Sequence, residues 1–125
     1  MEILSLGEKI KRKRKELNMT LKDLAGDRIT PGQISLVESG KSNPSMDLLD
    51  YLATTLNTSS EYLMESEETQ AEKICFFYEN IAAALILSSD LLQAEQNIEK
   101  SLYYSEKYKL EHRKARNLSL RGDIF

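Results

Sequence analysis

Helix-capping signatures lie so close together in the first half of the chain that only short helices fit between them. A Ser or Thr followed three residues later by an acid or amide caps the first turn of a helix reciprocally. Four candidate helix starts in the first half carry such a pair: Ser5 with Glu8, Thr20 with Asp23, Thr30 with Gln33, and Thr58 with Glu61. Each predicts a helix start, and Ser45, which follows a proline, predicts one more.

Glycine and proline set the limits of these helices. Pro31 stands at the first helical position after Thr30, where its missing N–H costs nothing. Gly26 keeps the second helix short, and Gly40 is placed to end the third in a left-handed conformation. Strand-like alternation of apolar and polar residues is absent from the sequence. We therefore expect an all-α fold that begins with a five-helix domain over residues 1–66.

The second half of the chain has a different pattern. Apolar residues recur at helical spacing over roughly residues 70–87 and 91–108, with a Ser-Ser-Asp break between the two runs. These runs predict an αα-hairpin, and a third helical run begins near Glu111. The sequence is therefore expected to divide into residues 1–66 and residues 67–125.

Composition fits a folded helical protein and does not by itself indicate nucleic acid. The chain has 125 residues, of which 41% are hydrophobic and 30% charged, and its formal net charge is −3. Residues 1–66 hold 9 basic against 10 acidic side chains. One cysteine, Cys75, fits a reducing cytoplasm. Neither a signal peptide nor an apolar run long enough to span a membrane is visible.

Patterns for catalysis or metal binding have little support. His112 lies among charged residues and is expected on an exposed helix surface, and Cys75 lies in an apolar stretch and is expected to fill the core. The sequence has no cysteine–histidine cluster for zinc, no glycine-rich phosphate loop and no nucleophile motif. We expect neither enzyme activity nor a cofactor or metal.

The segment from Thr20 to Asn43 reads as two short helices joined by a tight turn. In a helix-turn-helix the second helix enters the DNA major groove and the first braces it. Gln33 is the one side chain on the predicted outward face that can bond both polar atoms of an adenine edge, and Leu36 could touch a thymine methyl. The expected DNA-facing residues on this helix are Thr30, Pro31, Gly32, Gln33, Ser35 and Leu36.

Phosphate contacts are expected on either side of this helix. Lys41, Ser42 and Asn43 offer a charge, a hydroxyl and backbone N–H groups just past its end. The basic first helix offers Lys13 or Lys9 as a further clamp. Two short helices with a tight turn also occur in proteins that never meet DNA, and basic runs are usually a solvated helix face.

Two charged residues fall on apolar helix faces. Arg14 follows Ile10 by four residues, and Glu38 follows Ile34 by four, so both side chains are expected to point inward. We predict that Arg14 and Glu38 pair with each other, because an uncompensated buried charge costs about 3–5 kcal/mol. The pair would fix the angle of the predicted reading helix.

The run from Ile34 to Pro44, ISLVESGKSNP, together with the spacing to Thr20 and Ala25, resembles the phage-repressor/Cro (XRE) family of helix-turn-helix regulators. The resemblance extends from about Leu6 to Leu63. It implies a five-helix repressor-like domain that binds operator DNA through the helix beginning near Thr30.

The chain departs from this family at several positions. The family usually has Gln after the threonine of the second helix, where this chain has Leu21, which puts a phosphate or base contact in doubt. Pro31 and Gly32 stand where many members carry base-reading side chains. Fewer direct contacts would leave more of the recognition to DNA shape.

The second half resembles a tetratricopeptide-type helical hairpin, with Ala82 and Gly122 in equivalent places and residues 121–125 opening the next repeat. Such repeats after a DNA-binding head resemble the peptide-responsive regulators of Gram-positive bacteria. That likeness implies a homodimer formed through the C-terminal helices and control by a signalling peptide. Because the chain holds about one and a half repeats, we expect it to be a fragment that also dimerises.

Two functions remain open from the sequence. One is a sequence-specific transcriptional regulator that acts as a dimer on operator DNA. The alternative is a helical-repeat adaptor for protein interactions with a head that does not bind DNA, which the residues at Leu21, Pro31 and Gly32 keep open.

Overall fold

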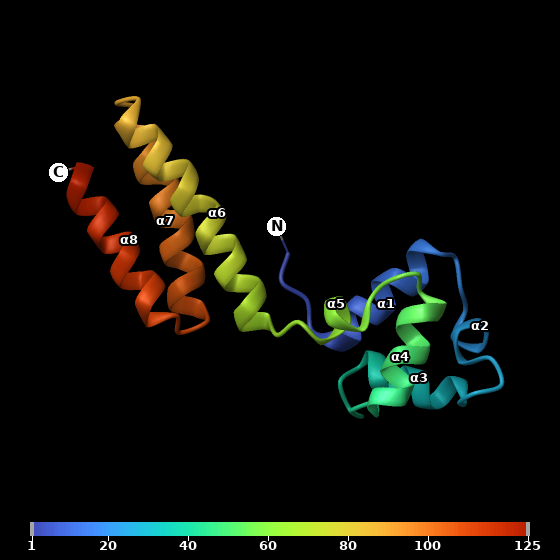
Figure 1. Ribbon diagram of the computed structural model, residues 1–125. Helices are drawn as coiled ribbons and strands as arrows, with labels where there is room; N and C mark the ends of the chain where they lie inside the picture. The colour runs from blue at the N-terminus through green and yellow to red at the C-terminus, as the bar shows by residue number, and fades with distance from the viewer. Residues whose placement is uncertain (1, 125) are drawn as a thin grey trace. The chain divides into compact units, whose positions relative to one another are not determined.

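The computed structural model describes the backbone of residues 2–124 and the side chains of residues 2–122. Residues 2–124 form eight helices and no strand (Figure 1). The all-α prediction is confirmed. The chain divides into two compact units, Glu2–Ser66 and the residues from Glu67 onward. Phe125, part of the predicted next repeat, lies outside the described residues.

The first unit holds five short helices: α1 Leu6–Glu16, α2 Leu21–Ala25, α3 Pro31–Glu38, α4 Met46–Thr55 and α5 Ser60–Met64. Reciprocal capping boxes begin α1 at Ser5, α2 at Thr20 and α3 at Thr30, and Ser45 caps α4. These four predicted starts are confirmed. Their hydrogen bonds span three residues, so the sequence alone determines them.

The predicted start of α5 at Thr58 is wrong by one residue. The N-cap is Ser59, whose hydroxyl accepts a hydrogen bond from the Tyr62 N–H at 3.0 Å. Thr58 instead completes the end of α4, because its N–H donates to the Ala53 carbonyl at 2.9 Å. Asn57 between them is left-handed, with φ of 55°. Thr58 therefore belongs to the preceding helix stop, and the next helix begins after it.

A buried apolar cluster joins the five helices. Its members are Ile10, Leu24, Ala25, Ile34, Val37, Leu49, Leu52, Ala53, Leu56 and Leu63. Gly7 lets α1 approach the end of α3, since a Cβ there would stand 2.6 Å from the Val37 carbonyl oxygen. The close contact places α1 directly behind α3.

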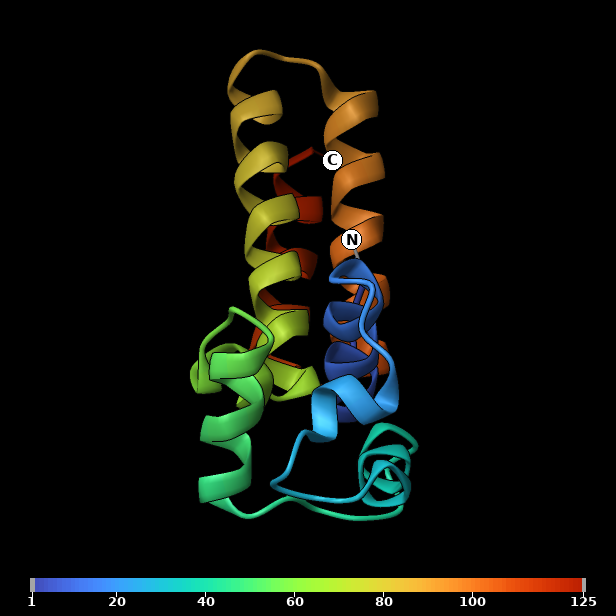
Figure 2. The same ribbon diagram turned by 90° about the vertical axis from the view of Figure 1, so that its right-hand side faces the viewer.

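The second unit holds three longer helices: α6 Glu67–Leu87, α7 Leu91–Lys107 and α8 Glu111–Ile124. They pack side by side, with α7 in contact with both of the others (Figure 2). The predicted hairpin and third helix are confirmed, although α6 begins at Glu67 and not near residue 70. The tetratricopeptide likeness stays a prediction; Ala82 is buried, whereas its supposed equivalent Gly122 is exposed.

Polar contacts as well as apolar ones hold this unit together. Cys75 on α6 and Ser101 on α7 exchange hydrogen bonds, each side chain donating to the other residue's carbonyl at 3.4 and 3.3 Å. Cys75 is fully buried, as predicted, and burial raises the pKa of its thiol. The Cys75 thiol at the contact between α6 and α7 is therefore neutral and inaccessible to solvent.

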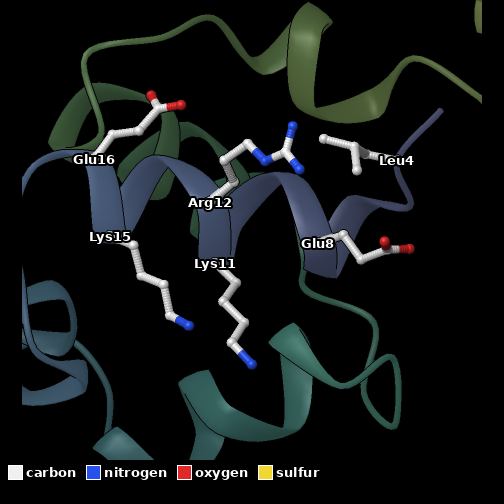
Figure 3. Close-up of a pocket in the computed structure, with 6 residues that line it drawn as sticks. All are labelled: Leu4, Glu8, Lys11, Arg12, Lys15 and Glu16. Atoms are coloured by element: carbon white, nitrogen blue, oxygen red, sulfur yellow. The ribbon is translucent and has the colours of Figure 1, made fainter. Parts of the chain in front are cut away.

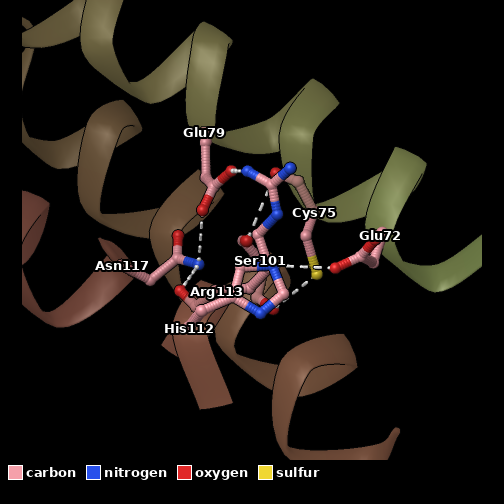
Figure 4. Close-up of polar contacts among 7 residues, drawn as sticks. All are labelled: Glu72, Cys75, Glu79, Ser101, His112, Arg113 and Asn117. Carbon is pink, nitrogen blue, oxygen red and sulfur yellow. Dashed lines mark hydrogen bonds and ion pairs between the residues drawn. The ribbon is translucent and has the colours of Figure 1, made fainter. Parts of the chain in front are cut away.

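A buried carboxylate joins α6 to α8. Arg113 and Asn117 on α8 donate to the two oxygens of Glu79 on α6, at 2.9 and 3.1 Å (Figure 4). His112 lies nearer the surface, where its Nε2 is 2.8 Å from Glu72. With a side chain that is 68% exposed, His112 lies on the helix surface as predicted. The buried Glu79 fixes the register of α8, because losing either partner would leave a charge poorly compensated.

Candidate nucleic-acid interface

The outward side of α3 forms a continuous exposed surface. All six residues expected to face DNA are exposed: Thr30, Pro31, Gly32, Gln33, Ser35 and Leu36. Ile34 and Val37 on the opposite side are buried in the core. Most of the exposed side chains of α3 are short and uncharged. If α3 enters a DNA groove, it therefore brings few long side chains to the base edges.

α2 packs against the inner side of α3 through Leu24 and Ala25, both fully buried. The end of α2 is held from α4, because the Tyr51 hydroxyl lies 2.8 Å from the Leu24 carbonyl and 3.2 Å from that of Ala25. Gly26 follows with φ of 54°, a conformation that favours glycine. The turn before α3 is therefore held in one geometry by α4.

Arg14 and Glu38 join α1 to the last turn of α3. Arg14 Nε donates to Glu38 Oε2 at 2.7 Å and Nη2 donates to Oε1 at 3.1 Å, which is the bidentate geometry. A third bond runs from Arg14 to the Met19 carbonyl at 2.9 Å. The side chains are 12% and 7% exposed. The hydrogen bonds to Glu38 hold the pKa of Arg14 above its ordinary value, so this link remains charged.

Gln33 has a structural partner as well as an exposed position. Its Oε1 accepts a hydrogen bond from the Thr30 N–H at 3.3 Å and completes the capping box of α3. A carbonyl oxygen has two lone pairs, so Gln33 can keep this bond while its amide group meets a base. The side chain that the sequence predicts to read adenine therefore also holds the start of α3.

The loop after α3 offers fewer backbone donors than predicted. The N–H groups of Lys41 and Ser42 both donate to the Leu36 carbonyl, at 2.9 and 3.2 Å. This closes the helix end around Gly40, whose φ is 77°. The expectation that these backbone N–H groups hold phosphates is therefore wrong for Lys41 and Ser42. Their side chains, and Asn43, remain exposed to solvent.

The cations of α1 have separate surroundings. Lys9 is buried and donates to the Tyr62 and Glu65 carbonyls, both at 2.7 Å, so its predicted phosphate contact is wrong. Lys13 lies 3.7 Å from Glu16 and 5.5 Å from the centre of the Tyr62 ring, which places it toward α5. The carbonyls that bind Lys9 and the Tyr62 ring near Lys13 belong to α5 or to the residue that follows it. The packing of α5 therefore decides where these two flexible side chains lie.

Lys11 and Lys15 project together from another side of α1 (Figure 3). They border a depression of about 560 Å³ that Glu8, Arg12 and Glu16 also line. Arg12 is paired with Glu2. Within residues 2–124, Lys11 and Lys15 form no ion pair, so they are the cations of this helix that remain available to an anion.

Among the described residues, no group of three or more His, Cys, Asp or Glu side chains could hold a metal ion. Within residues 2–124, no helix combines the length and the hydrophobicity that a transmembrane segment needs. Leu21 packs against the core, which accounts for an apolar residue where a polar contact was expected.

Residues 10–63 match the family model described as Helix-turn-helix. The match covers α2, α3, α4 and most of α1 and α5, but less than half of the whole chain. It identifies the first unit as a helix-turn-helix domain and supports the XRE resemblance, which indicates a DNA-binding transcriptional regulator. Comparison with curated proteins and with solved structures found no match.

Proposed function

We propose that the protein is a sequence-specific DNA-binding transcriptional regulator that acts as a dimer on operator DNA. The observation that carries this proposal is the exposed outer side of α3, on a helix held from behind by the bidentate Arg14–Glu38 pair. A groove-reading helix needs both a free surface and a fixed angle. Regulation then consists of reversible occupation of a promoter, with no chemistry performed.

The proposed contacts follow from the surface that remains available. Gln33 reads a base, while Leu36 and the Thr30 methyl provide apolar contacts to thymine. Pro31, Gly32 and Ser35 allow close approach of the backbone. Lys41, Ser42 and Asn43 contact phosphates through their side chains, and Lys11 and Lys15 replace Lys13 as candidate cations on α1.

Dimerisation gives this small surface enough affinity and specificity. Two α3 helices related by a two-fold axis would read half-sites about 34 Å apart in a palindromic operator. The resemblance to peptide-responsive regulators leads us to propose the second unit as the dimerising part and as the receiver of a peptide or protein signal. Such a signal would act by changing the spacing or the stability of the dimer.

The experiment is selection of bound sequences from random DNA, followed by titration of the selected site at several salt concentrations. We expect an enriched, near-palindromic motif and a loss of roughly 10³-fold or more in affinity between about 50 and 200 mM salt. Lys11→Ala with Lys15→Ala should reduce the salt slope, whereas Arg116→Ala, which removes an exposed cation on α8 of the second unit, serves as the control and should leave the slope unchanged.

The adaptor alternative predicts a different result. The apolar Leu21 and the small residues at the start of α3 are the observations that favour it. An adaptor would enrich no DNA motif at any salt concentration. That outcome would contradict the proposed regulator.

A further inference from the structure

Several large apolar side chains of α6 are exposed to solvent. Between Ile74 and Leu87 its only charged or amide side chains are Glu79 and Asn80. A helix that is apolar all round is ordinarily buried all round. Here Phe76, Phe77 and Leu87 are 54%, 45% and 88% exposed.

Phe77 begins a row of aromatic rings that continues from α6 onto α7. The ring centres of Phe77 and Tyr78 are 5.3 Å apart, those of Tyr78 and Tyr104 6.4 Å, and those of Tyr104 and Tyr103 5.2 Å. Next to them lies a depression of about 550 Å³. We call this surface the α6–α7 aromatic face; it comprises Phe77, Tyr78, Gln96, Glu99, Lys100, Tyr103 and Tyr104. Phe77 and Tyr103 are exposed and Tyr78 and Tyr104 are half-buried, and exposed aromatic residues of this kind are typical of interaction surfaces.

The charges on this face are arranged to complement themselves. Glu99 and Lys100 both line the depression, and neither forms an ion pair within residues 2–124. A two-fold axis passing between them across α7 would set Lys100 against the partner's Glu99, and Glu99 against the partner's Lys100. The same antiparallel register brings Gln96 opposite the partner's Tyr103. Opposite charges at adjacent positions thus match a second copy of the same face.

We propose that the α6–α7 aromatic face binds the same face of a second copy of this chain, with the two α7 helices antiparallel. This inference rests on the dimer of the proposed function and names the surface that forms it. Aromatic rings from both copies fill the two depressions, and Glu99 and Lys100 set the register at the axis. Self-complementarity is a requirement of a two-fold interface and not of an unrelated partner.

The test is sedimentation equilibrium of the full chain with two single charge reversals, Glu99→Lys and Lys100→Glu. Each reversal sets like charges against each other twice across the axis, so self-association should weaken about tenfold or more. An equimolar mixture of the two variants should recover the wild-type dissociation constant, because one copy then carries two lysines and the other two glutamates. Tyr103→Ala should weaken the dimer, and neither the recovery nor this loss depends on DNA.

Arg116→Glu, an exposed reversal on α8, is the matched control and should leave association unchanged. If both single variants still dimerised, or if the mixture failed to recover the wild-type dissociation constant, the α6–α7 aromatic face would not be the dimer interface. The dimer of the proposed function would then have to form through another surface. A wild-type chain that stays monomeric up to millimolar concentration would overturn the inference. The DNA-binding part of the proposed function is judged separately, by gel shift on a single half-site.

Discussion

Gly7 on α1 lies directly against the backbone carbonyl of Glu38 at the end of α3, with no room for a side chain between them. A Cβ at Gly7 would also stand 2.6 Å from the neighbouring Val37 carbonyl oxygen, and both oxygens belong to backbone that cannot rotate away. The angle of α3 therefore depends on a residue with no functional group.

We expect Gly7→Ala to destabilise the protein by about 1–3 kcal/mol, because the added methyl overpacks a closed contact. The helix propensity gained from alanine, up to about 1 kcal/mol, offsets only part of this. Urea unfolding measures the change. Gly122→Ala on α8, where a Cβ would meet nothing within 4 Å, is the control and should be neutral or slightly stabilising. Equal effects at the two positions would contradict the close contact.

The Arg14–Glu38 pair gives a second prediction. Arg14→Met leaves Glu38 mostly buried without its partner, so stability should fall by roughly 3–5 kcal/mol. DNA affinity should fall with it, since α3 loses its hold on α1. The double change Arg14→Met with Glu38→Leu removes both charges and should recover most of the stability. A single variant that melts like the wild type and binds DNA normally would show that the pair does not position α3.

Gln33 is predicted to have two roles that substitutions can separate. Gln33→Glu keeps an acceptor for the Thr30 N–H and so keeps the capping box, but it removes the amide donor that bonds adenine. Gln33→Ala removes both. We expect each to cost about 1–3 kcal/mol on the preferred site, with Gln33→Ala alone also lowering the melting temperature.

Lys41→Ala is the comparison for Gln33, measured by the same gel shifts. It should weaken binding to every sequence alike. If Gln33→Ala and Lys41→Ala had the same effect on selected and random DNA, Gln33 would not be a base reader.

Asp23 makes the start of α2 sensitive to acid. The Thr20 N–H donates to its carboxylate at 2.9 Å, and this bond, with the Thr20 hydroxyl, lowers the pKa of Asp23. The folded state therefore releases this proton more readily than the unfolded state. The contribution is fully present above the unfolded value of about 3.9 and is lost as pH falls through the lower folded pKa.

Asp23→Ala should consequently lower the melting temperature at pH 7 and have progressively less effect as pH falls below about 4. Thermal unfolding followed by circular dichroism at a series of pH values measures this. Asp27→Ala, an exposed change in the following turn, is the control. A difference between wild type and Asp23→Ala that stays constant down to the acid limit would contradict the role of the carboxylate.

Local patterns predicted the helices well, because the caps at Ser5, Thr20 and Thr30 depend on bonds over three residues. The inward-pointing Arg14 and Glu38 could also be identified, since helical periodicity alone puts both on apolar faces. These features need no knowledge of how distant segments meet.

Contacts over long sequence distances were not predictable in the same way. Lys9 looked like any other lysine of the basic run, yet it reaches the carbonyl of Glu65. Tyr51 and Gly7 gave no signal, because their importance comes from α4 meeting α2 and from α1 meeting α3. The backbone N–H groups of Lys41 and Ser42 were expected to bind phosphate, but they donate to the Leu36 carbonyl. The sequence could not reveal these bonds, because they depend on the exact path of the loop after α3.

The capping boxes of α1, α2 and α3 also bear on how the chain folds during synthesis. Each helix start is encoded within four consecutive residues, and the core of the first unit is complete by Leu63. Domains generally fold as units as they leave the ribosome, and short-range contacts form quickly. We expect the helix-turn-helix domain to be folded while α6 to α8 are still being translated, so that the exposed aromatic side of α6 emerges next to a finished domain and not among other unfolded helices.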